Sequence, residues 1–108
     1  METTLLLNHD HMGHGAPDLG ARILKTFLQK ARALKGLESI LLVNSGVQLV
    51  HEGSPVRGEL ALLEDLGVDV IPCGTCLDAY NVQPAVGSIG SMDEIVKALD
   101  DAAKVITL

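Results

Sequence analysis

The chain has 108 residues, of which 47% are hydrophobic and only 2% are aromatic, and its formal net charge at pH 7 is -6. This length and composition predict one globular domain, residues 1–108, with an aliphatic core. The negative charge argues against nucleic acid and against an anionic membrane surface as partners, because both require a basic face. No stretch approaches the roughly 20 consecutive apolar residues that cross a bilayer, and the first residues lack the basic start of a secretory signal. A cytoplasmic protein without a membrane segment is therefore expected.

Short apolar runs alternate along the chain with amphipathic segments. In chain order the pattern predicts a strand at 3–7, a helix at 17–36, a strand at 39–43, a helix at 54–67, a strand at 68–71, a short helix starting within 74–77, a weak strand at 85–89, a helix at 91–102 and a strand at 104–108. The strand runs are apolar throughout, which is typical of parallel strands that are covered on both faces. We therefore predict an α/β domain with a five-stranded, mainly parallel sheet.

Local signals set the expected helix boundaries and faces. Ser54 is a candidate N-cap with Pro55 at the first helical position, and Ser91 with Glu94 forms a capping box. Two rows of apolar residues at helical spacing mark helix faces, and they are Leu19, Ile23, Phe27, Ala31 and Leu34 in the first helix and Met92, Ile95, Val96 and Leu99 in the last.

The loops after the strands are the candidate functional segments, because ligands in open α/β sheets bind beyond the carboxyl ends of the strands. These loops are 8–16, 44–53, 72–76 and 87–91, and they are rich in Gly, His, Asn and Ser. With a strand order of 2-1-3-4-5, the first and third strands would be neighbours. The histidine-rich loop would then lie beside the cysteines.

The only two cysteines, Cys73 and Cys76, form a C-x-x-C at a strand-to-helix junction. Gly74 allows a sharp turn, and Thr75 can cap the following helix with Asp78 as its capping-box partner. The start of a helix favours a thiolate, so the pair indicates thiol chemistry. Two buried structural cysteines are the alternative.

Histidines leave a metal site open as a second alternative. His9, His11 and His14 lie in one loop, and together with the cysteines they would complete a Cys2His2 zinc site if the loops converged. A protonated histidine beside a thiolate would instead lower the thiol pKa. The spacing is not that of a known zinc finger, and the glycines of this loop are spaced too widely for a dinucleotide fingerprint, so no metal and no cofactor is expected.

Four motifs in register resemble the DsrE/DsrF-like domain, and most closely the C-terminal domain of YedF-type selenium-metabolism proteins. The first is D-x-M-G-x-G, formed by Asp10, Met12, Gly13 and Gly15 and followed by Leu19-Gly20. The others are NSGV with Asn44, Ser45 and Gly46, then CGTCLD with Cys73, Gly74, Thr75 and Cys76, and finally SMDEIV at 91–96. The resemblance covers nearly the whole chain.

The resemblance implies a flavodoxin-like, three-layer domain that assembles into a homo-oligomer, a dimer, trimer or hexamer, and takes part in intracellular sulfur relay. The family cysteine that carries persulfide sulfur falls on Cys73, and Cys76 is then the extra thiol of the YedF-like branch. The three motif loops would contact substrate or partner. YedF-type proteins carry a TusA-like domain before this one, so a TusA-like carrier is expected to act in trans. Sulfur and selenium both remain open as the transferred atom.

The expected mechanism is attack of the Cys73 thiolate on a donor persulfide, with Cys76 as the resolving thiol. Cys76 lies nearer the helix dipole if the helix starts at Thr75, so the reverse assignment stays open. Three rival functions also remain: a thioredoxin-like disulfide reductase, which lacks an evident cis-proline strand here, a non-catalytic oligomeric binding or assembly module, and a zinc-binding domain.

Overall fold

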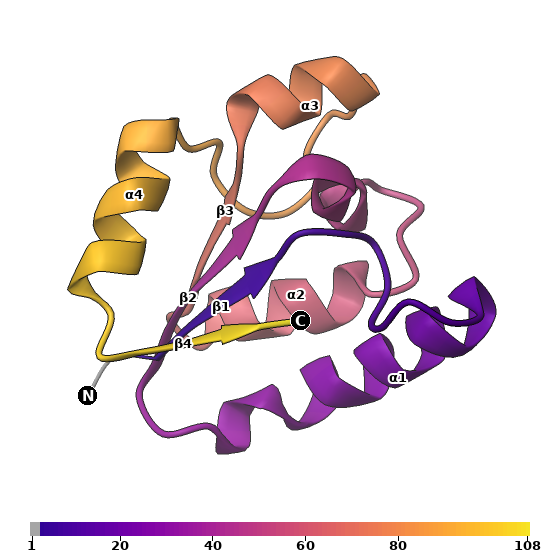
Figure 1. The fold of residues 1–108 in the computed structure, drawn as a ribbon, viewed down its shortest axis with the longest axis horizontal. Coiled ribbons are helices and arrows are strands. Elements are labelled where there is room, and N and C mark those ends of the chain that lie inside the picture. The colour runs from indigo at the N-terminus through magenta and orange to yellow at the C-terminus, as the bar shows by residue number, and fades with distance from the viewer. Residues whose placement is uncertain (1–2) are drawn as a thin grey trace.

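The structure is a computed structural model that describes residues 3–108, so the first two residues of the predicted domain 1–108 lie outside the described part. Its centre is a parallel sheet of four strands in the order β3-β2-β1-β4 (Figure 1). The strands are β1 (Thr3–Leu7), β2 (Leu37–Leu42), β3 (Asp69–Pro72) and β4 (Lys104–Thr107). The predicted α/β class and parallel sheet are confirmed, and these four strands lie within two residues of their predicted bounds.

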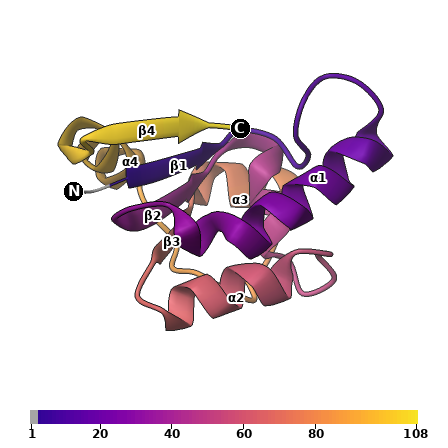
Figure 2. The ribbon, with the colours of Figure 1, turned by 90° about the horizontal axis from the view of Figure 1, so that it is seen from below.

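Helices cover both faces of the sheet. On one face lie α1 (Pro17–Lys30), which continues as the 3-10 segment η1 (Ala31–Ala33), and α2 (Arg57–Asp65), and the two helices are side by side (Figure 2). α4 (Met92–Asp101) lies on the opposite face (Figure 1). This is expected, because the chain reverses its direction across the sheet after β3 and connections of one handedness then change face. The 3-10 segment η2 (Asn44–Val50) and α3 (Gly74–Tyr80) pack together beyond the carboxyl ends of the strands.

The predicted fifth strand at 85–89 is wrong, so the sheet has four strands instead of five. The N–H groups of Ser88 and Gly90 donate to backbone carbonyls of β3 at 2.9 Å each, but the pairing amounts to an isolated bridge at Gly90. Gly87 has a φ of 87°, which turns the chain inside the predicted strand. The segment therefore follows the outer edge of β3 without becoming a strand of the sheet.

The strand order 2-1-3-4-5 is also wrong. β2 lies between β1 and β3, so the loop that carries the cysteines is beside the loop after β2 and not beside the histidine-rich loop after β1. The order reverses between β1 and β4, whereas the cysteines follow β3, at the other side of the sheet. Four equally apolar parallel strands give no local signal for their order, because the order depends on long-range packing.

α1 turns a different face to the core from the predicted one. Leu19 is 51% exposed, whereas Leu24 and Leu28 are buried. Gly20 sets this rotation, because a Cβ there would lie 2.5 Å from the carbonyl oxygen of Met12 in loop 8–16. The helix is also shorter than predicted, because its last turn tightens into η1.

The segment between β2 and β3 also differs from its prediction. The loop predicted at 44–53 contains η2, which buries Val47 and Val50. α2 starts at Arg57, later than predicted, because Ser54 Oγ accepts the Val56 N–H at 3.2 Å within a turn that precedes the helix. Burial of η2 fixes the start of this segment at the carboxyl end of β2.

Capping was predicted correctly for one helix and wrongly for two, and in α2 the N-cap residue is Val56 instead of the predicted Ser54. The capping box of Ser91 and Glu94 at the start of α4 is confirmed, with Ser91 Oγ accepting the Glu94 N–H at 3.3 Å. α3 instead starts at Gly74 with Cys73 as its N-cap, so the capping box predicted from Thr75 is wrong. The N-cap is thus two residues earlier than predicted, and Cys76 is the third residue of the helix, within its first turn.

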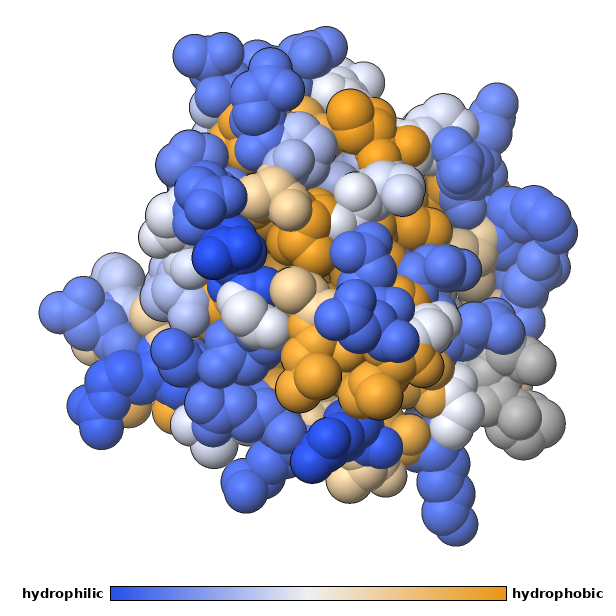
Figure 3. All heavy atoms as spheres, turned by 180° about the vertical axis from the view of Figure 1, so that it is seen from behind, coloured by the Kyte–Doolittle hydropathy of each residue, from blue (hydrophilic) through white to orange (hydrophobic). Residues whose placement is uncertain are grey.

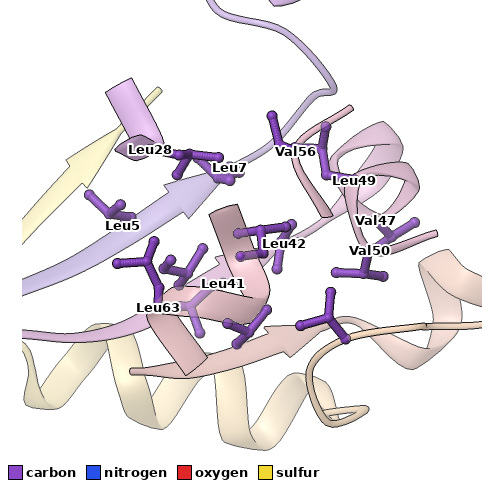
Figure 4. Close-up of a cluster of buried hydrophobic side chains, with 14 of the residues drawn as sticks. Leu5, Leu7, Leu28, Leu41, Leu42, Val47, Leu49, Val50, Val56 and Leu63 are labelled. Atoms are coloured by element: carbon purple, nitrogen blue, oxygen red, sulfur yellow. The ribbon is translucent and has the colours of Figure 1, made fainter. Parts of the chain in front are cut away.

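The core is aliphatic and lies mainly between the sheet and the α1–α2 layer. Figure 4 shows side chains of β1 and β2, such as Leu7 and Leu41, between Leu28 of α1 and Leu63 of α2. The apolar side chains of η2 extend the same cluster beyond the carboxyl end of β2. This packing holds η2 rigidly next to α3, where the candidate site lies.

Apolar side chains also reach the surface. They are visible on the face seen from behind in Figure 3. The large exposed residues of the described chain include Leu62 of α2, Leu66 directly after α2, Ile89, and Met92 and Val96 of α4. In the predicted face of α4, only Ile95 is fully buried. Within residues 3–108, no helix has the length and apolar character needed to cross a membrane.

Candidate functional site

Cys73 and Cys76 lie at the junction of β3 and α3. The Cys73 N–H donates to the Leu42 carbonyl at 2.9 Å, which extends the β2–β3 pairing by one residue, and the Cys73 side chain is only 2% exposed. Cys76 lies in the first turn of α3 and is partly exposed. Both are free thiols. The pair therefore places one thiol in the core and the other at the surface.

A backbone hydrogen bond joins the surface thiol to the end of β2. The Asn44 N–H donates to Cys76 Sγ at 3.1 Å. Asn44 has a left-handed backbone, with a φ of 52°, which asparagine tolerates better than most residues. A donor that faces sulfur stabilises negative charge on it, so this contact favours the thiolate of Cys76.

The side chain of Asn44 joins η2 to α3. Its Oδ1 accepts the Ser45 N–H at 2.9 Å and the Tyr80 O–H at 2.8 Å. Tyr80 follows Cys76 by four residues on α3, so the two side chains share one face of this helix. Asn44 therefore contacts two side chains of α3. Its backbone N–H bonds the Cys76 thiol, and its amide oxygen bonds the Tyr80 hydroxyl.

The protein environment raises the pKa of the Cys76 thiol. Burial is the largest cause, and the neighbouring Cys73 raises the pKa further, while the Asn44 N–H opposes both. At neutral pH the thiol form of Cys76 is therefore favoured. Its thiolate forms when the pH rises or when a bound partner changes the surroundings.

The histidine-rich loop forms a separate cluster. The rings of His9 and His11 lie 4.7 Å apart and those of His9 and His14 lie 5.6 Å apart, and His11 Nδ1 bonds Asp10 Oδ1 at 2.8 Å. Among residues 3–108, no group of three or more histidine, cysteine or acidic side chains is placed to hold a metal ion. No hydrogen bond found in that part of the chain joins these histidines to either thiol.

Packing around small residues positions the loops. Gly20 makes room for Met12 and His11, and the Met12 N–H donates to the Gly20 carbonyl at 3.1 Å. Gly46 is buried against the Leu7 carbonyl, where a Cβ would not fit. The contact at Gly46 brings the start of η2 against the end of β1, so the loops after β1, β2 and β3 form one continuous edge.

The predicted site residues therefore divide into two groups. One group surrounds the surface thiol and comprises Asn44, Ser45, Gly46, Cys73, Gly74, Thr75 and Cys76. The other lies in the loop after β1 and comprises Asp10, Met12, Gly13 and Gly15. Within the first group Thr75 is exposed, and Gly74 donates its N–H to the Gly90 carbonyl at 3.0 Å.

Sequence reasoning missed Tyr80. It is the only tyrosine of the chain and lies on the same face of α3 as Cys76, four residues later. This spacing was a usable signal. The partner of Tyr80, Asn44, was predicted as a site residue, but their contact spans 36 positions of sequence and had no local signal.

Fold and site together define an α/β protein with a four-stranded parallel sheet and a two-cysteine site at the end of β3. Three solved structures share this fold, at identities that establish likeness of fold alone. The ychN protein from E. coli matches over 100% of both chains with 19% identity and a TM-score of 0.72. The protein of unknown function MTH1491 from Methanobacterium thermoautotrophicum matches 99% of this chain and 98% of its own, with 16% identity and a TM-score of 0.73.

The third is the conserved protein of unknown function BT1422 from Bacteroides thetaiotaomicron. It matches 99% of this chain and 94% of its own, with 18% identity and a TM-score of 0.66. No protein-family model matches the chain, and no curated protein matches it significantly in sequence. The three neighbours share the α/β fold of this chain, which agrees with the α/β class and the parallel sheet predicted from the sequence.

Proposed function

We propose that the protein is a sulfur carrier that holds a persulfide on Cys76 and passes the outer sulfur atom to a partner. The observation that carries this proposal is the Asn44 N–H at 3.1 Å from Cys76 Sγ, beside a second, buried thiol. A partly exposed thiol can meet the sulfur of another molecule, whereas Cys73 is 2% exposed. We therefore assign the first attack to Cys76 and the resolving role to Cys73.

The transfer exchanges one S–S bond for another. The Cys76 thiolate attacks the outer sulfur of a donor persulfide, the S–S bond of the donor breaks, and the donor leaves as a thiolate that takes up the proton lost by Cys76. An acceptor thiolate then attacks the outer sulfur on Cys76 and receives it. The Asn44 N–H stabilises the Cys76 thiolate both as nucleophile and as leaving group.

Cys73 offers a second exit for the same sulfur. If no acceptor arrives, the Cys73 thiol attacks Cys76 Sγ, a Cys73–Cys76 disulfide forms, and the outer sulfur leaves as hydrogen sulfide. Both cysteines are oxidised and the transferred sulfur is reduced, so the step needs no outside oxidant. The buried position of Cys73 keeps this thiol away from other molecules while leaving it next to Cys76.

The wider setting follows from the resemblance to YedF-type proteins. The proposed acceptor is a TusA-like carrier in the cytoplasm, and selenium is the alternative to sulfur as the transferred atom. The exposed apolar residues of α2 and α4 support assembly into a homo-oligomer, because large exposed apolar patches are typical of protein interfaces.

The test is the intact mass of the reduced protein after incubation with a persulfide donor, for wild type, Cys73→Ala and Cys76→Ala. We expect one added sulfur atom that accumulates in Cys73→Ala, because the resolving thiol is absent. Wild type is expected to convert to the disulfide, and Cys76→Ala is expected to gain no sulfur.

Other outcomes would change the assignment. If wild type and Cys76→Ala gain a sulfur atom and only Cys73→Ala does not, the carrier role moves to Cys73. The absence of a sulfur adduct in all three proteins, with intact folding by circular dichroism, would refute the sulfur-carrier proposal. A thiol-disulfide redox domain or a non-catalytic assembly module would then be the remaining hypotheses.

A further inference from the structure

A polar hollow lies between the end of η2 and the end of α3, and its lining includes Tyr80, which follows Cys76 on α3. Its volume is about 320 Å³, and its polar lining comes from Gln48, His51, Ser54, Tyr80 and Asn81. Its lining residues include no aspartate, glutamate, lysine or arginine. The hollow is thus lined by hydrogen-bonding groups from side chains other than Asp, Glu, Lys and Arg, and it is large enough for a small molecule.

Most of the lining groups have hydrogens left to donate. His51 Nδ1 accepts the Gly53 N–H at 3.1 Å, so in its neutral form the ring carries its hydrogen on Nε2. Ser54 Oγ accepts the Val56 N–H at 3.2 Å, which leaves the Ser54 hydroxyl hydrogen for another acceptor. The amide of Gln48 adds two further donors. Several donors, with no carboxylate in the lining itself, favour an anionic group such as a carboxylate.

Tyr80 connects this hollow to the thiol. It lines the hollow and donates its hydroxyl hydrogen to Asn44 Oδ1, while Asn44 donates its N–H to Cys76 Sγ. Cys76 and Tyr80 are four residues apart on α3, which corresponds to about 5–6 Å between their Cβ atoms. A molecule with its carboxylate in the hollow therefore needs only a short carbon chain to bring a sulfur atom to Cys76.

The charge of the protein narrows the choice of molecule. A net charge of -6 repels small anions at long range, but it does not repel a zwitterion. The Tyr80 oxygen has donated its hydrogen to Asn44, so its lone pairs remain free to accept a hydrogen from an ammonium group. An α-amino acid supplies both a carboxylate and an ammonium group without net charge.

We propose that the hollow binds a small α-amino acid that carries a persulfide, and that this molecule is the sulfur donor to Cys76. The inference rests on the proposed sulfur-carrier function for its role as donor, but not for its binding. In the transfer the S–S bond of the amino acid persulfide breaks, a new S–S bond forms at Cys76 Sγ, and the amino acid leaves as a thiol with the proton released by Cys76.

The test uses an unreactive analogue, so that binding is measured apart from sulfur chemistry. The reduced full-length chain is titrated with S-methylcysteine, and with 2-(methylthio)ethylamine, which lacks the carboxylate, while amide signals are followed by two-dimensional NMR. We expect saturable shifts at Gly53, Ser54 and Asn81 with S-methylcysteine, and binding of the amine that is weaker by about tenfold or more, as for loss of one hydrogen bond to a charged group.

Matched variants check that the hollow itself is responsible. Gln48→Ala is expected to weaken S-methylcysteine binding about tenfold, because an amide donor to a charged group is lost. Gln83→Ala is the control, because Gln83 is exposed and is not part of the hollow lining. Equal affinities for the two ligands, equal affinities for the two variants, or no shifts at these amides would each overturn the proposal.

The two proposals fail in different ways. Shifts at the hollow together with the absence of sulfur on Cys76 in Cys73→Ala would keep the amino acid site and refute the sulfur carrier. Sulfur on Cys76 without shifts at the hollow would keep the carrier and refute the amino acid donor site.

Discussion

Asn44 is the residue whose substitution tests the geometry of the site most directly. Its left-handed backbone costs an ordinary residue about 1–2 kcal/mol, and glycine avoids this cost. Its Oδ1 accepts two hydrogen bonds, each with a net contribution of roughly 0.5–1.5 kcal/mol. Asn44→Gly loses the two hydrogen bonds, and Asn44→Ala loses them and also strains the backbone. We expect the free energy of unfolding to fall by about 1–3 kcal/mol in Asn44→Gly and by about 1–2 kcal/mol more in Asn44→Ala.

Urea denaturation followed by circular dichroism measures both losses, and Tyr80→Phe completes a double-mutant cycle with Asn44→Gly. The coupling energy is expected to match one hydrogen bond, roughly 0.5–1.5 kcal/mol, because Tyr80→Phe removes only the hydroxyl group. Equal stabilities of Asn44→Ala and Asn44→Gly would refute the left-handed conformation. A coupling energy of zero would refute the contact between η2 and α3.

Three further predictions concern the thiol, the loop after β1 and the rotation of α1. Burial and Cys73 raise the pKa of Cys76, so the rate of Cys76 alkylation should rise at a higher pH in the folded protein than in the unfolded chain. Cys73→Ala should move this rise to lower pH. A pH dependence that Cys73→Ala leaves unchanged would contradict the proximity of the two thiols. Gly20→Ala should lower the free energy of unfolding in urea denaturation by about 1–3 kcal/mol, because the new Cβ would lie 2.5 Å from the Met12 carbonyl oxygen. Gly15→Ala is the control and should have little effect, because there is open space around Gly15. Equal losses of stability in the two variants would contradict the packing of loop 8–16 on α1. Leu28→Ala should lower the free energy of unfolding by about 2–5 kcal/mol, and Leu19→Ala by less than about 1 kcal/mol. A larger loss in Leu19→Ala than in Leu28→Ala would mean that the face of α1 predicted from the sequence was right.

The sequence was sufficient to predict those features of the fold that depend on one short segment of the chain. Four strands were predicted from continuous apolar runs, and the capping box of Ser91 and Glu94 was predicted from two residues three positions apart. It was insufficient for features that depend on a contact between residues far apart in the chain. The rotation of α1 depends on Gly20 fitting against Met12, and the loss of the predicted fifth strand depends on how the chain turns at Gly87 along β3.

The candidate site shows the same division. The C-x-x-C and its place at the end of β3 were evident from the sequence, which also predicted that the segment beginning at Asn44 belongs to the site. The exposure of the two thiols was not, because it depends on the exact start of α3 at Gly74 and on the packing of η2 against it. The strand order had the largest consequence, since it brings Asn44, and not the histidines, to Cys76.

The raised pKa of Cys76 also bears on which kind of thiol chemistry this site performs. Disulfide oxidoreductases with a C-x-x-C lower the pKa of the attacking thiol, so that it reacts rapidly at neutral pH. Here burial and the second thiol act in the opposite direction. In the proposed sulfur carrier, a leaving Cys76 thiolate of higher pKa departs more slowly, so transfer of the outer sulfur to other thiols is slowed, while attack by Cys73 on Cys76 Sγ stays open as the competing exit. The Asn44 N–H then provides the local stabilisation that the thiolate needs at the moment of transfer.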